Sequence, residues 1–104
     1  MTNTMRFKGM LAATILLACT ASFAQSGEAT YKTKCQSCHG AAGTPSPGMA
    51  KLMGIKPASD PEMQKLTADE VAAAVKNGKG KMKPIAGLTD TQVKEVAAYF
   101  KTLK

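Results

Sequence analysis

The 104-residue sequence has no tryptophan, two tyrosines, three phenylalanines, one histidine and three cysteines. A single histidine excludes metal sites that use two histidines. A tetrahedral zinc site needs four ligands, and it would lack one if Cys19 were removed with the N-terminal export signal described below. Runs of β-branched or alternating residues of strand length are absent, which argues against the thioredoxin-like use of a cysteine pair. No motif interleaves aromatic with basic residues, so nucleic acid is not an expected partner. The lack of strand patterns, together with the helix signals described below, predicts an all-α domain.

The segment Cys35-Gln36-Ser37-Cys38-His39 carries the clearest chemical signal in the chain. Cys-x-x-Cys-His is the pattern of covalent attachment of a c-type haem. Two thiols one helical turn apart can each bond to one haem vinyl group, and the adjacent imidazole can then bind the iron. The motif therefore predicts one haem c bound through Cys35 and Cys38, with His39 as an iron ligand.

The first 24 residues have the pattern of a secretory signal peptide. Arg6 and Lys8 precede an apolar stretch over residues 11–18, and small residues lead to a cleavage site after Ala24. Polar residues interrupt the stretch, so an uncleaved membrane anchor is less favoured. The segment before Cys19 also resembles a lipobox, and a lipid on this cysteine would tether the protein to a membrane. We expect a periplasmic protein, either free after cleavage or lipid-anchored at Cys19.

Residues 25–104 form one predicted domain with a net charge of +5, because 12 of the 14 basic residues and all seven acids remain after cleavage. A chain of 80 residues buries only a modest fraction of its surface and usually needs an additional staple. A covalently held, largely apolar macrocycle would give such a core a centre to pack around.

Helix signals divide this domain into three main segments. A first helix is expected from about Gly27 to Cys38, followed by a loop where glycine and proline recur between Gly40 and Gly48. Residues 67–70 and 89–92 match the capping box, so each predicts the start of a further helix. The helix that begins at Thr67 should end at Asn77-Gly78. Apolar residues at helical spacing follow both boxes, namely Val71, Ala74 and Val75, then Val93, Val96, Ala97, Phe100 and Leu103. Met63 and Leu66, after Asp60-Pro61, suggest one further short turn.

Over residues 25–104 the sequence resembles the small class I bacterial cytochromes c. Gly27 and Tyr31 lie eight and four residues before Cys35, where the family has a glycine and an aromatic residue. Residues 96–100 look like the terminal-helix segment that crosses the first helix there, and glycine lets two helix backbones approach closely. The resemblance implies an all-α, cytochrome c-like helical domain wrapped around one covalent haem.

The resemblance also implies a methionine as the second axial ligand of the iron. Residues 77–84 are similar to the family's distal methionine loop, which makes Met82 the expected ligand. Lys83 separates Met82 from Pro84, whereas the family often has these two residues adjacent. Three further methionines remain open as alternatives, namely Met49, Met53 and Met63.

A proline carbonyl of the family accepts a hydrogen bond from the free ring N–H of the proximal histidine, which orients the imidazole. Pro47 is the expected residue here, and Pro45 is the alternative. Loop length alone does not decide between them.

Iron bound by histidine and methionine stays six-coordinate in both oxidation states, which suits electron transfer rather than catalysis. We expect a non-enzymatic, monomeric carrier of single electrons between respiratory or dehydrogenase partners. Five lysines flank the two loops that would frame the haem, namely Lys51, Lys56, Lys79, Lys81 and Lys83. They favour redox partners with acidic docking patches, although a merely solvated basic surface is the alternative reading.

Two other functions remain open. A haem enzyme or ligand-binding sensor would need a displaceable Met82, and the chain has no second histidine to act as a distal acid or base. A permanent electron-transfer subunit of a larger oxidoreductase is compatible with the length of the domain.

Overall fold

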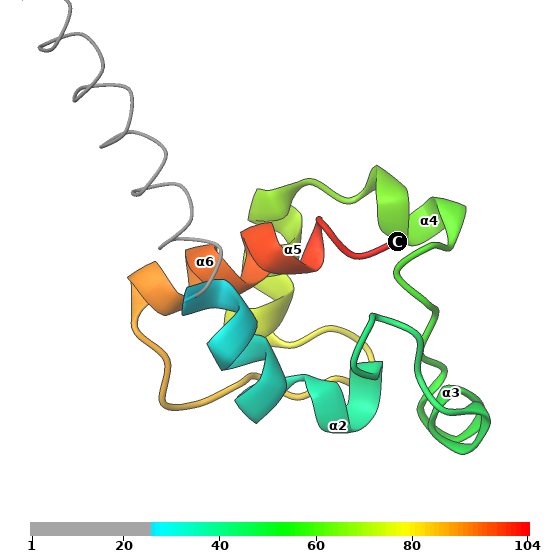
Figure 1. Cartoon of the computed structure of the whole chain (residues 1–104). Helices are drawn as coiled ribbons and strands as arrows, with labels where there is room; N and C mark the ends of the chain where they lie inside the picture. Colours follow the sequence, from blue (N-terminus) through cyan, green and yellow to red (C-terminus); the bar gives the residue numbers. More distant parts are fainter. Residues whose placement is uncertain (1–25) are drawn as a thin grey trace, which may run out of the picture.

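The computed structural model describes residues 26–104, so the predicted signal peptide and Cys19 lie outside the described residues. A helical segment over residues 26–34 opens this part of the chain. Five labelled helices follow (Figure 1), namely α2 (Gln36–His39), α3 (Pro47–Met53), α4 (Pro61–Lys65), α5 (Ala68–Asn77) and α6 (Asp90–Phe100). Residues 26–104 contain no β-strand, which confirms the all-α prediction. None of the helices described has the length and apolar character needed to span a membrane.

The first predicted helix, from Gly27 to Cys38, is interrupted at one residue. Cys35 has φ −118° and ψ −33°, well away from the helical φ of about −63°. Backbone hydrogen bonding nevertheless continues through the irregularity, since the Cys35 N–H donates to the Tyr31 carbonyl at 2.9 Å. The helical path then resumes as α2 and ends where Gly40 adopts a positive φ of 82°.

Both capping boxes form as predicted and begin α5 and α6. The Thr67 hydroxyl accepts the Glu70 N–H at 3.1 Å, while the Glu70 carboxylate accepts the Thr67 N–H at 3.3 Å. Thr89 and Gln92 repeat this exchange at 3.1 and 2.9 Å. Helix α5 also ends at Asn77, as the Asn77-Gly78 pair predicts.

The prediction that Pro47 and Gly48 lie in a loop is wrong, because both residues are helical. The loop ends at Ser46, and α3 begins at Pro47. Ser46 caps this helix by accepting the Met49 N–H at 3.3 Å, and proline suits the first turn of a helix because its missing N–H is not needed there. Figure 1 shows α3 set apart at the edge of the molecule.

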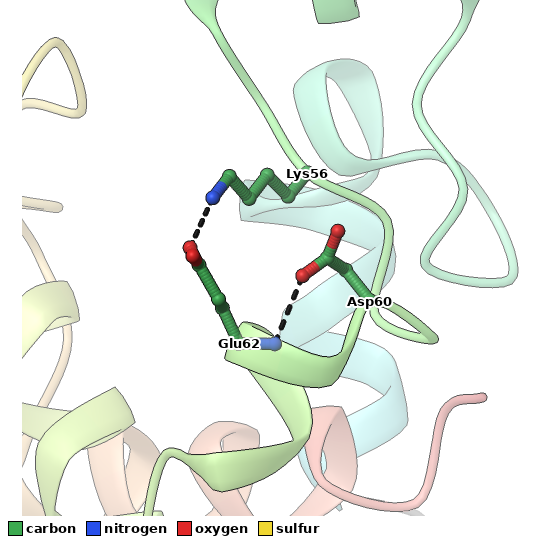
Figure 2. Close-up of polar contacts among 3 residues, drawn as sticks. All are labelled: Lys56, Asp60 and Glu62. Atoms are coloured by element: carbon green, nitrogen blue, oxygen red, sulfur yellow. Dashed lines mark hydrogen bonds and ion pairs between the residues drawn. The ribbon is translucent and has the colours of Figure 1, made fainter.

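The short turn predicted after Asp60-Pro61 is present as α4. The Asp60 carboxylate caps it by accepting the Glu62 N–H at 2.9 Å. The Glu62 side chain also pairs with the Lys56 ammonium, so this lysine is tied to the start of α4 (Figure 2).

The core lies between α5, α6 and the helical segment 26–34. Nine side chains form it, namely Tyr31, Cys35, Ala58, Val71, Val75, Val93, Val96, Ala97 and Phe100. Ala74 and Leu103, which were also predicted to be apolar contacts, are half-buried. Gly27 lies where the first helical segment passes α6, because a Cβ added there would be 2.4 Å from the Glu95 carbonyl oxygen. The predicted helix crossing is therefore confirmed.

Candidate functional site

The Cys-x-x-Cys-His motif occupies one helical turn. The His39 and Cys38 N–H groups both donate to the Cys35 carbonyl, at 2.9 and 3.2 Å, which places the two cysteines one turn apart. Cys35 is buried and belongs to the core, whereas Cys38 and His39 are half-buried. No disulfide joins Cys35 and Cys38, so both sulfur atoms can bond to a ligand.

Burial controls the protonation of these groups. It raises the pKa of the Cys35 thiol to about 11, and the nearby Cys38 adds to the shift. Burial also lowers the pKa of His39, which favours the neutral imidazole, the form that binds metal ions. The imidazole lies edge-on to the Phe100 ring, with centroids 5.8 Å apart. His39 therefore presents a neutral ring beside an aromatic side chain of α6.

The backbone folds back on itself immediately after His39. The Gly40 carbonyl accepts two hydrogen bonds, from the Tyr31 hydroxyl at 2.5 Å and from the Gly43 N–H at 3.3 Å. A Cβ at Gly40 would lie 1.9 Å from the Thr44 oxygen, so this close approach requires glycine. The family resemblance predicts only an aromatic residue at position 31, and the hydroxyl of tyrosine is the one feature of the sequence that points to this polar contact.

The two candidate prolines lie in different environments. Pro45 is buried and directly follows the turn after His39, and its nitrogen would be 3.3 Å from a Cβ at Gly40. Pro47 is exposed at the first position of α3. Of the two, Pro45 is the one in the tightly packed turn beside the motif.

Met82 lies in a tight turn between α5 and α6. The Lys79 N–H donates to the Met82 carbonyl at 2.9 Å, and the Met82 N–H donates to the Lys79 carbonyl at 3.0 Å. Gly80 adopts a φ of 59° within the turn, and the Ile85 N–H anchors the following chain to the Val75 carbonyl at 2.9 Å. The half-buried Met82 side chain packs against the core cluster that contains Cys35.

The three methionines that are alternatives to Met82 as iron ligand lie on two helices, α3 and α4. Met63 packs against the core from α4, while Met49 and Met53 are half-buried on α3. The Lys81 ammonium donates to the Leu52 carbonyl at 3.2 Å, which joins the Met82 turn to α3.

These residues fit a covalently attached haem. Within residues 26–104 no group of three or more His, Cys, Asp or Glu side chains could hold a bare metal ion. A thiol pair, a neutral imidazole and a thioether are instead available to a haem iron and its vinyl groups. Several large apolar side chains around the core also stay half-buried, among them Met63, Leu66, Ile85 and Leu88. Such partly covered apolar surface suits a large apolar ligand.

Comparison with known proteins places this geometry in context. A family model described as cytochrome c oxidase, cbb3-type, subunit III matches residues 22–100. The solved structure of KustC0563 c-type cytochrome is similar at 26% sequence identity and a TM-score of 0.66, covering 75% of this chain and 96% of that chain. No curated protein matches the sequence.

Proposed function

The chain belongs to the c-type cytochrome family that the cbb3-type subunit III model describes, and on this basis we propose that it is an exported monohaem carrier of single electrons. Membership implies electron transfer with covalently bound haem c. The observation that carries the finer proposal is the single turn that joins Cys35, Cys38 and a neutral His39.

In this proposal each residue of the motif has one role. The two thiols bond to one haem through Cys35 and Cys38, and His39 binds the iron through its neutral ring. When bound, the haem supplies a centre that gains and loses one electron. Edge-on packing of His39 on Phe100 restricts rotation of the imidazole. The buried Pro45, rather than the exposed Pro47, is favoured as the carbonyl partner of the free ring N–H.

Met82 completes the proposed ligand set. Its turn is held by two reciprocal backbone hydrogen bonds and by the Ile85 contact, so the thioether is presented from an ordered segment. A thioether favours ferrous iron and raises the reduction potential, which suits an electron carrier.

Visible spectra of the exported, haem-loaded protein test these assignments. Haem that survives acid-acetone extraction would support covalent attachment. A weak near-infrared-edge band in the ferric protein should be lost in Met82→Ala and retained in Met63→Ala, a control that truncates another half-buried methionine of the core. Loss of the band in Met63→Ala instead would contradict the assignment. A high-spin wild type that binds carbon monoxide readily would favour a ligand sensor.

The proposed docking face for redox partners comprises the Met82 turn and α3. Lys79, Lys81 and Lys83 are exposed around Met82, and α3 adds the exposed Lys51. The Leu52 side chain, 67% exposed, supplies an apolar contact on the same face. A basic rim around an apolar contact favours an acidic partner surface. Lys56 contributes less than the sequence suggested, because Glu62 pairs with it (Figure 2).

Oxidation by ferricyanide, an anionic probe, tests this face. Exchanging both Lys79 and Lys83 for glutamate should slow the second-order reaction by about tenfold at low salt, and the difference should shrink as ionic strength rises. Lys65→Glu on α4, applied together with Lys94→Glu on α6, makes the same charge change at exposed lysines of other elements. Equal slowing by both pairs would show that only net charge matters and would contradict a localised docking face.

Export and lipidation are tested together by the mass of the mature protein. We propose export to the periplasm, and a mass that begins at Gln25 would indicate cleavage after Ala24. A diacylated mass that begins at Cys19 would indicate a membrane-tethered carrier. A full-length cytoplasmic product would contradict export.

A permanent subunit of a larger oxidoreductase is the second candidate, because the matching family model carries the name of an oxidase subunit. A stoichiometric partner retained through purification would favour it. Elution as a haem-loaded monomer that exchanges electrons freely would favour the diffusible carrier.

A further inference from the structure

The Tyr31 hydroxyl makes a partly buried hydrogen bond that ring packing does not explain. Only 1% of Tyr31 is exposed. Its ring packs on Tyr99 and Phe100, with centroids 5.4 and 6.5 Å apart, and a phenylalanine would serve for both contacts. The hydroxyl instead donates to the Gly40 carbonyl at 2.5 Å, nine residues along the chain. This bond links the first helical segment to the backbone immediately after His39.

The Gly40 carbonyl belongs to a turn that has little freedom to move. The Gly43 N–H donates to the same carbonyl, and the Gly43 carbonyl accepts the Ala58 N–H at 2.8 Å. Gly43 has a φ of 83°, and a Cβ there would lie 2.8 Å from the Ala58 Cβ and 3.2 Å from the Leu103 Cβ. The turn is therefore packed against the segments that contain Ala58 and Leu103. Displacement of the Gly40 carbonyl would shift the chain that leads to the buried Pro45.

Tyr31 is also linked to the His39 ring through Phe100. The Tyr31 ring packs on Phe100, and Phe100 contacts the His39 ring edge-on. One side chain thus holds both the backbone that follows His39 and the aromatic ring that lies against its imidazole.

We propose that Tyr31 is a positioning residue for the proximal histidine, and that its hydroxyl holds the turn over residues 40–45 where this turn can orient the His39 ring. This inference rests on the proposed function, in which His39 binds the haem iron. The proposed function gives the free His39 ring N–H the Pro45 carbonyl as its acceptor, and a loosened turn would weaken that hydrogen bond. The imidazole then donates less electron density, which destabilises ferric iron relative to ferrous iron.

Tyr31→Phe in the haem-loaded protein is the test, with Tyr99→Phe as the matched control. Tyr99 belongs to the same aromatic cluster, and within residues 26–104 its hydroxyl has no hydrogen-bond partner. Tyr31→Phe should speed hydrogen exchange at the Gly43 amide about fivefold, the factor expected for one lost hydrogen bond. It should also raise the reduction potential by about 30 mV, the equivalent of a threefold change in a one-electron equilibrium. Tyr99→Phe should change neither.

Three outcomes would overturn the inference. One is an unchanged Gly43 exchange rate in Tyr31→Phe. The second is faster Gly43 exchange in Tyr31→Phe with an unchanged reduction potential, because the Tyr31–Gly40 hydrogen bond would then have a structural role only. The third is an equal shift of the reduction potential in Tyr99→Phe. If the Tyr31→Phe protein does not accumulate, proton NMR of the wild type provides the test. The inference requires a slowly exchanging Tyr31 hydroxyl proton close to the Gly43 amide proton, and the absence of such a proton would overturn it. A wild type without covalent haem would instead contradict the proposed function itself.

Discussion

Replacing Gly27 with alanine tests the helix crossing that closes this domain. The added Cβ would lie 2.4 Å from the Glu95 carbonyl oxygen, 2.9 Å from its carbonyl carbon and 2.9 Å from the Tyr99 Cβ. Two of these atoms belong to the backbone of α6 and cannot rotate away. The first helical segment and α6 must therefore separate to admit the methyl group.

The expected cost follows from two opposing effects. Overpacking a close contact costs about 1–3 kcal/mol, and the rigid neighbours of Gly27 place this change near the upper end. Alanine is about 1 kcal/mol more favourable than glycine inside a helix, which offsets part of the cost. Gly27→Ala should therefore lower the free energy of unfolding by about 2 kcal/mol. For a domain of this size the melting temperature should fall by about 8–16 °C.

Guanidinium and thermal unfolding of the haem-loaded protein, followed by far-ultraviolet circular dichroism, would measure this loss. Gly48→Ala is the matched control, because Gly48 lies in α3 and a Cβ there would meet nothing within 4 Å. The control should leave the stability unchanged or raise it by up to about 1 kcal/mol. A Gly27→Ala protein as stable as Gly48→Ala would refute the close crossing.

Three further predictions concern the caps, alkaline pH and the thiols. Thr67→Ala and Thr89→Ala should each lower the free energy of unfolding by about 1 kcal/mol in guanidinium titrations, because each removes the cap of an otherwise intact helix. Burial raises the pKa of Tyr31 to about 12. The unfolded chain therefore loses this proton first, near pH 10, and stability present below pH 10 should fall by roughly 2–3 kcal/mol towards pH 12. Unfolding measured across that range should show a smaller decline in Tyr31→Phe, and equal declines would contradict the assignment. Before haem attachment, iodoacetamide should modify Cys38 faster than the buried Cys35. Equal labelling rates would show that the haem-free chain does not hold this structure.

Features that depend on neighbouring residues were predictable from the sequence. The cysteine spacing places two thiols on one turn of any helix, and each capping box closes within four consecutive residues. Both helix starts and the end of α5 were therefore predicted correctly. Helix α3 was missed although its signal is also local, because Pro47 and Gly48 were interpreted as helix breakers rather than as the first turn after the Ser46 cap.

In the candidate site, too, residues close in the sequence were predictable, whereas contacts between distant segments were not. The thiol pair and His39 come from one pentapeptide, whereas Met82 required the resemblance to a known family. No local pattern indicated that Lys81 contacts the Leu52 carbonyl across 29 residues, or that Glu62 pairs with Lys56. These contacts depend on how separate segments meet.

By itself, therefore, the sequence determined the Cys-x-x-Cys-His turn, the helical class and the caps, because covalent spacing and hydrogen bonds between near neighbours act within a few residues. Only the tertiary structure decided that Pro45 is buried while Pro47 is exposed, and that the Tyr31 hydroxyl reaches the Gly40 carbonyl. Burial and long-range hydrogen bonds arise when distant segments pack together, so they depend on the whole fold rather than on the residues beside them.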